Sequence, residues 1–140
     1  MPLTRQPEII GQTPAGYVVN WPPTSGTLEG RAFRATVVPG GEHQTTVRPD
    51  GIGVVSASVT VRTHDGALVD LHHTGMVDYG ADWTERLKQG NWPASLPVRT
   101  HIRLLTSDAR YAWLNRLACI SVGEVRPAEP LFVYDLYAVR

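Results

Sequence analysis

Short runs of alternating apolar and polar residues recur along the chain, and clusters of glycine and proline separate them. In residues 31–38, for example, Phe33, Ala35 and Val37 alternate with Ala32, Arg34 and Thr36, as expected for a strand with one buried face. The other runs are rich in valine, threonine and aromatic residues, a composition typical of strands. We therefore expect strands at residues 16–21, 31–38, 52–63, 67–74, 98–105, 111–122 and 131–139.

The pair Asp65-Gly66 lies between two of these runs and predicts a tight hairpin, because glycine tolerates positive φ. A two-residue turn would pair Ser58 with His73. One face would then carry Ser56, Ser58, Thr60, Arg62, Val69, Leu71 and His73, and we assign it to the interior. The opposite face would carry Ala57, Val59, Val61, Leu68, Asp70 and His72. A three-residue loop with a bulge would change this pairing.

A single helix is expected at residues 81–90. Asp82 can cap its N-terminus and Glu85 lies three residues later, as in a capping box. Trp83 and Leu87 share one face, and Gly90 can end the helix. Because so short a helix depends on packing, we expect it to cover one end of the sheet.

About seven antiparallel strands at this spacing suit a sandwich or a closed barrel. Residues 131–139 are apolar on both faces, as expected for a strand between a filled lumen and a helix or a neighbouring subunit. We predict a mainly β fold: a single antiparallel β-barrel with one short helix, in one domain over residues 1–140. Residues 1–15 are expected to form an extended N-terminal arm. A homodimer or larger homo-oligomer would cover the outer apolar positions.

Composition narrows the function classes. The 140 residues include 13 basic and 13 acidic ones, so no positive excess is available to neutralise a nucleic acid backbone. No apolar run approaches the ~20 residues of a membrane helix, and residues 1–10 lack the apolar stretch of a signal peptide. The single Cys119 excludes an internal disulfide. We expect a cytoplasmic protein that binds neither nucleic acid nor membranes.

His73 is the first candidate for chemistry, since imidazole titrates near neutral pH and can act as a general base. On the predicted face, Ser58, Thr60 and Leu71 would surround it and contact a substrate. The alternative is a structural histidine that bonds a backbone carbonyl.

A second set of candidates comes from other segments. Arg103 or His101 could point into the lumen and hold an anionic oxygen, or could belong to a solvated basic face. Glu29 lies between glycines at the mouth of a strand, where partial burial would make it a proton-transferring group. The glycines could equally serve backbone geometry alone.

The segment 108–115 reads DARYAWLN. If it is extended, Tyr111, Trp113 and Asn115 alternate onto one face and line either a pocket or the core. We expect no metal, because no two of the five histidines show ligand spacing on one face. We also expect no cofactor, since the chain has no phosphate loop, dinucleotide glycine pattern or nucleophile elbow.

Five motifs occur in a characteristic order: GTLEG at 26–30, PGG at 39–41, VRPDG at 47–51, RTHDGAL at 62–68 and DARYAWLN at 108–115. Together they resemble the bacterial and fungal family called domain of unknown function 3237, over residues 16–139. The resemblance implies an antiparallel barrel similar to calycins and to allene oxide cyclase. This chain departs from the usual pattern at residues 42–44, at Ser56, Ser58 and at His73. These changes suggest a repurposed pocket.

Two functions follow as hypotheses. The first is a cofactor-free enzyme that performs proton-transfer chemistry of the isomerase, cyclase or lyase type on a hydrophobic, aromatic or polyketide-like molecule, with His73, Glu29, Tyr111 and Arg103 as catalytic groups. The second is a barrel that binds such a molecule without changing it. A purely structural protein with a filled lumen is a third possibility.

Overall fold

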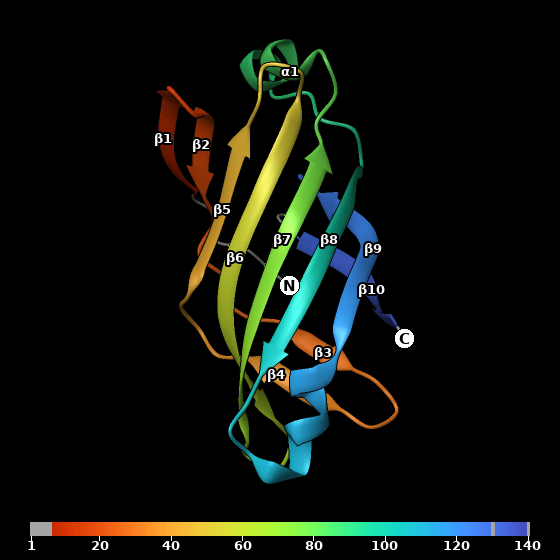
Figure 1. The fold of residues 1–140 in the computed structure, drawn as a ribbon. Coiled ribbons are helices and arrows are strands. Elements are labelled where there is room, and N and C mark those ends of the chain that lie inside the picture. Colours follow the sequence, from red (N-terminus) through yellow and green to blue (C-terminus); the bar gives the residue numbers. More distant parts are fainter. Residues whose placement is uncertain (1–6, 130, 140) are drawn as a thin grey trace.

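A computed structural model describes residues 7–129 and 131–139, which form one long, curved antiparallel sheet (Figure 1). The strands are β1 (Glu8–Thr13), β2 (Gly16–Asn20), β3 (Thr27–Glu29), β4 (Arg34–Val37), β5 (Glu42–Val47), β6 (Ile52–Thr63), β7 (Leu68–Asp78), β8 (Leu96–Leu105), β9 (Ala118–Arg126) and β10 (Leu131–Val139). Their order is β1-β2-β5-β6-β7-β8-β9-β10, and β4 joins β3 to the end of β6. The mainly β antiparallel architecture is confirmed, but the ladder between described strands does not close.

Two short helices lie at opposite ends of the strands, α1 (Trp83–Gln89) and the 3-10 helix η1 (Ala109–Arg116) (Figure 1). In α1 the expected cap at Asp82 does not form, because its carboxylate accepts a hydrogen bond from Arg86 Nε at 3.0 Å instead. Gly90 ends the helix in the left-handed conformation, as expected. No helix within the described residues is both long and apolar enough to span a bilayer.

A strand was expected at residues 111–122. Residues 118–122 do lie in β9, but residues 111–116 belong to η1, so that part of the prediction is wrong. The Asp108 side chain accepts a hydrogen bond from the Arg110 backbone N–H at 2.9 Å and starts η1. Tyr111, Trp113 and Asn115 therefore do not share one strand face. Of the expected N-terminal arm, residues 8–13 form β1 and pair with β2, whereas residues 1–6 lie outside the described part of the chain.

The hairpin between β6 and β7 has a three-residue loop, and the two-residue turn is wrong. The Thr63 N–H donates to the Ala67 carbonyl at 2.8 Å, and Gly66 takes φ 93° within the loop. Ser58 consequently pairs with His72, and Ala57 pairs with His73. Every residue of β6 moves to the face opposite the one predicted, because side chains alternate along a strand.

The inward face has three layers from one end to the other. Near η1, one apolar cluster includes Val59, Val69, Leu71 and Leu104. Near α1, a second cluster comprises Val55, Val77, Leu96, Val98, Val125 and Phe132. Between them the strands place buried polar side chains: His43, Thr45, His73, Thr100 and Ser121. The middle of the sheet is therefore polar although it is sealed from solvent.

Candidate functional site

A large cavity of about 1160 Å³ lies at the η1 end of the sheet. The edge strands β3 and β10, the helix η1 and the loop before β3 line it. Its walls are mainly apolar and aromatic: Leu28, Phe33, Trp113, Leu114, Leu117, Leu131, Phe132, Tyr134 and Leu136. The carboxylates of Glu29 and Asp135 lie at its rim, where both residues are exposed. A cavity of this size and lining suits a hydrophobic small molecule.

The floor of the cavity is formed by buried side chains of the central strands. Val59, Leu71, Leu104 and Cys119 line it from β6, β7, β8 and β9. Burial raises the pKa of the Cys119 thiol, so this group stays protonated and is a poor nucleophile at neutral pH. The floor therefore provides shape and apolar contact rather than covalent chemistry.

Two histidines meet behind the inner wall of this cavity. The rings of His43 on β5 and His73 on β7 lie 5.1 Å apart between centroids, and the two residues are 2% and 1% exposed. No ring nitrogen of either histidine has a hydrogen-bond partner among the described residues. Burial lowers the pKa of His73 to about 4. Burial, reinforced by the neighbouring His73, lowers the pKa of His43 to about 3.

Two aromatic side chains of β10 separate this histidine pair from the cavity. The Tyr134 ring stacks on His73 with 6.2 Å between centroids, and the Phe132 ring lies 4.6 Å from that of His43. Both aromatic residues also line the cavity. Burial raises the pKa of Tyr134 to about 12, so its phenol is protonated. The histidines are thus neutral imidazoles, each able to donate and accept one hydrogen bond, one side chain away from the cavity.

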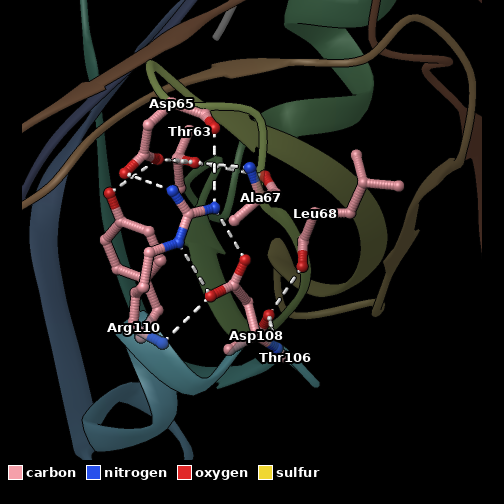
Figure 2. Close-up of polar contacts among 8 residues, drawn as sticks. Thr63, Asp65, Ala67, Leu68, Thr106, Asp108 and Arg110 are labelled. Carbon is pink, nitrogen blue, oxygen red and sulfur yellow. Dashed lines mark hydrogen bonds and ion pairs between the residues drawn. The ribbon is translucent and has the colours of Figure 1, made fainter.

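A network of polar side chains fixes η1 to the β6–β7 hairpin and so holds the wall that carries Trp113 (Figure 2). Asp65 Oδ1 accepts hydrogen bonds from the hydroxyls of Thr63 at 2.6 Å and Tyr111 at 2.9 Å. Arg110 bridges Asp65 at 3.1 Å and Asp108 at 2.8 Å. The hydrogen bond from the Thr63 hydroxyl is the main cause that lowers the pKa of Asp65. The hydrogen bond from Tyr111 and the positive charge of Arg110 lower it further. The network needs the ionised carboxylate.

We expect Asp65→Asn to lower the Tm by about 3–8 °C at pH 7, because an amide cannot accept from Thr63 and Tyr111 and also pair with Arg110. The lowered pKa of Asp65 means that its contribution is present above the ordinary carboxyl pKa and disappears as the pH falls below it. Thermal scans from pH 7 to pH 3 should therefore show the two proteins converging. Glu85→Gln on α1 is the control, and an equal effect of both changes would contradict this role.

The comparisons with known proteins agree with this architecture. A family model described as "Protein of unknown function (DUF3237)" matches residues 2–139. The chain belongs to the DUF3237 family. A UPF0311 protein from Clostridium acetobutylicum is 31% identical over 114 residues, which cover 80% of this chain and 69% of that protein.

Solved structures of other proteins share the fold of this DUF3237 member. A β-barrel-like protein from Acinetobacter baumannii superposes with a TM-score of 0.83 at 24% identity, over 99% of this chain and 89% of the other. An enzyme from Penicillium herquei superposes with a TM-score of 0.68 at 21% identity, over 98% of this chain and 87% of its own. At these identities the likeness shows the fold.

The structure brings some of the sequence-predicted site residues together. Leu71, Trp113 and Glu29 line the cavity, Glu29 at its exposed rim rather than in the partly buried position expected. His73 lies inside the sheet, behind Tyr134. Tyr111 faces the hairpin network, and Asn115 holds the backbone of Thr106 with hydrogen bonds of 2.8 and 2.9 Å. Tyr111 and Asn115 therefore position η1.

Four other predicted residues lie on the outer face of the sheet. Arg103 and His101 are exposed on β8, so the expectation that one of them points into the lumen is wrong. Ser58 and Thr60 alternate with the buried residues of β6, because the true hairpin register reverses their face. His101 instead bonds the Thr74 hydroxyl through Nδ1 at 2.8 Å. Neighbouring His72 pairs with Asp70 at 2.7 Å.

His43 is the residue that the sequence-based selection missed. It follows the PGG motif, and it alternates with exposed residues on β5, as do Thr45 and Val47, which also point inward. Ser56 and Ser58, on the neighbouring strand β6, point outward. The signal that could have found His43 is this inward position on a strand, which brings it against His73 in the buried pair.

Proposed function

We propose that this chain is a cofactor-free enzyme that performs proton-transfer chemistry, of the isomerase, cyclase or lyase type, on a hydrophobic or aromatic, polyketide-like molecule. The observation that carries the proposal is the buried pair of His43 and His73, with four ring nitrogens unpartnered among the described residues, next to the cavity of about 1160 Å³. The His73 imidazole is unprotonated at neutral pH, as a general base must be, but burial makes it a weak base, with a pKa of about 4. A substrate oxygen that accepted a hydrogen bond from the imidazolium would raise this pKa toward the range of an effective general base.

The energetic cost of the pair supports a functional role. A buried polar group without a partner costs about 1–3 kcal/mol, and native proteins keep few of them. Each histidine carries two such nitrogens, and those of His73 lie behind the Tyr134 ring, where a polar group of a ligand that passed this ring could bond them. Apolar side chains would pack the same space without this cost. The pair is therefore better explained by chemistry than by packing.

The cavity residues suggest a division of roles. Trp113 and Leu71 offer an aromatic face and an apolar floor for the substrate. The Tyr134 phenol, protonated at neutral pH because burial raises its pKa to about 12, can donate a hydrogen bond to a developing oxyanion. His73 would take the proton as general base, and Glu29 at the rim would exchange protons with solvent. The enzyme from Penicillium herquei supports the view that this fold can host catalysis.

The proposal can be tested before the natural substrate is identified. A panel of phenols, aryl ketones and small polyketide-like compounds is first screened for binding by thermal shift. Compounds that bind are incubated with the protein in D₂O and examined by mass spectrometry and proton NMR. We expect deuterium at a carbon position, or a new isomer, with the unmodified protein and with the outer-face control Arg103→Leu, and neither with His73→Leu. Compounds whose binding is weakened by Trp113→Ala, and which therefore bind in the large cavity, would contradict catalysis if they returned unchanged and unlabelled.

The runner-up function is carriage of a hydrophobic molecule without chemical change. It is favoured by one observation: the Phe132 and Tyr134 rings stand between the histidines and the cavity. A carrier of a neutral ligand would show an affinity that hardly varies from pH 6 to pH 8, and it would give no labelled product in the experiment above.

We also propose that two copies of the chain associate through the outer face of the sheet. Val54, Met76 and Val122 are 43%, 49% and 40% exposed and lie in one row across β6 to β9, interrupted by Arg99. A second copy of the chain would cover these exposed apolar side chains. Light scattering should return at least twice the 15.4 kDa of one chain. Met76→Lys should shift the protein toward the monomer, whereas a monomeric unmodified protein would contradict the proposal.

A further inference from the structure

A second, smaller cavity of about 200 Å³ lies beside α1, the helix at the opposite end of the strands from η1 (Figure 1). Aromatic side chains from five separate segments line it: Tyr17, Trp21, Tyr79, Trp83, Trp92 and Phe132. The chain thus places three of its four tryptophans around this one space. Such a concentration of aromatic surface is typical of sites that hold a ring-shaped ligand.

Contacts between these aromatic residues fix the shape of the cavity. The rings of Tyr17 and Trp83 lie 5.8 Å apart at 55°, and those of Tyr79 and Trp92 lie 5.7 Å apart at 67°. The indole N–H of Trp83 donates to the Pro49 carbonyl at 3.4 Å. These contacts hold the rings in place, so a ligand would enter a largely preformed cage.

One polar atom distinguishes this cavity from an ordinary apolar core. Thr45 lines it and is 1% exposed, and its hydroxyl has no partner with hydrogen-bond geometry among the described residues. Burial raises the pKa of the neighbouring Tyr79 to about 12, and a polar contact with the Thr45 hydroxyl opposes this rise. This contact occupies at most one of the hydrogen-bonding positions of the hydroxyl. A hydroxyl can donate one hydrogen bond and accept two, so Thr45 retains capacity for a ligand oxygen.

The lining residues also indicate which ligand charge this cavity can accept. No charged side chain of the described residues lines this cavity, and burial of an ion without a counter-charge is costly. The volume is somewhat larger than the engineered apolar cavity of about 150 Å³ that binds benzene. A neutral molecule with one ring and one oxygen therefore fits both the size and the chemistry.

We propose that this aromatic cage is a second binding site, which takes a neutral one-ring compound and hydrogen-bonds its hydroxyl or carbonyl oxygen through Thr45. The site is separate from the large cavity, because the two share only Phe132 among their lining residues. It does not depend on the catalytic proposal, which uses the large cavity and the histidine pair.

The test compares p-cresol, which carries a hydroxyl, with toluene, which has the same ring and methyl group without it. The indole N–H signals of the four tryptophans in ¹⁵N–¹H NMR spectra report where each compound binds, once single Trp→Phe variants assign them. We expect p-cresol to shift the signals of Trp21, Trp83 and Trp92 saturably, and to leave that of Trp113 in the large cavity unchanged.

The hydroxyl of Thr45 is tested by Thr45→Val, which keeps the shape of the side chain. We expect the affinity for p-cresol to fall about three- to tenfold while that for toluene stays the same. Thr74→Val on the outer face of β7 is the matched control and should alter neither affinity. If Thr45→Val does not fold, Thr45→Ser and Thr45→Ala make the same comparison. Shifts at Trp113 alone, no saturable binding, or equal losses for both compounds would overturn the proposal.

Discussion

Acidification from pH 6.5 toward pH 4 is expected to destabilise the protein steeply, because His43 and His73 are buried as neutral imidazoles. Burial lowers the pKa of His43 to about 3 and that of His73 to about 4. In the unfolded chain both titrate near 6.5, so below that pH the unfolded state binds protons that the folded state excludes. Titration of the pair thus leaves the stability unchanged above pH 6.5 and lowers it increasingly as the pH falls below that value.

Each histidine should lower the free energy of unfolding by about 1.4 kcal/mol per pH unit in this range, and the pair should lower it by about 2–3 kcal/mol per pH unit. A single domain has only about 5–15 kcal/mol in total, so unfolding near pH 4–5 is expected. Urea titrations at half-unit intervals from pH 8 to pH 4 measure the slope. The double variant His43→Leu with His73→Leu should flatten it, and a slope that survives in this variant would show that other groups cause the acid sensitivity.

The long strands were predicted well because their sequences alternate cleanly. The expected bounds 52–63 and 131–139 coincide with β6 and β10. By contrast, β5 was missed, because Glu42, His43, Gln44, Thr45 and Thr46 are all polar and the inward positions carry a histidine and a threonine. A buried polar layer hides the hydrophobic pattern on which strand prediction relies.

The error at η1 has a different origin. Apolar side chains at Tyr111 and Trp113 imitate the two-residue period of a strand, whereas a 3-10 helix repeats every three residues. The competing signal was Asp108, a common residue at the start of a helix, whose side chain bonds the Arg110 N–H. Local spacing alone could not decide between the two.

Much of the site depended on the hairpin register. Asp65-Gly66 correctly located the turn, but the loop includes His64 as well, and this single extra residue moved Ser58 and Thr60 outward. His73 kept its inward position because the face of β7 had been assigned correctly. The approach of β5, which brings His43 against His73, is a contact across 30 residues that local pattern could not supply.

The variant with the largest expected effect on function is His73→Leu, which should make the protein more stable and less active at the same time. Leucine has a similar volume and removes two buried nitrogens that have no partner among the described residues, so the free energy of unfolding at pH 7 should rise by about 1–3 kcal/mol. If His73 is the general base, turnover of the substrate found in the D₂O screen should fall by a factor of about a hundred to ten thousand.

His72→Leu is the matched control, since it changes the adjacent residue of the same strand. His72 points outward and pairs with Asp70 at 2.7 Å, so its loss should alter neither stability nor turnover by much. Urea unfolding and turnover per folded molecule are measured on all three proteins. A His73→Leu protein that is less stable and turns over normally would identify His73 as a structural histidine, and the general base would then be sought at Glu29 on the cavity rim.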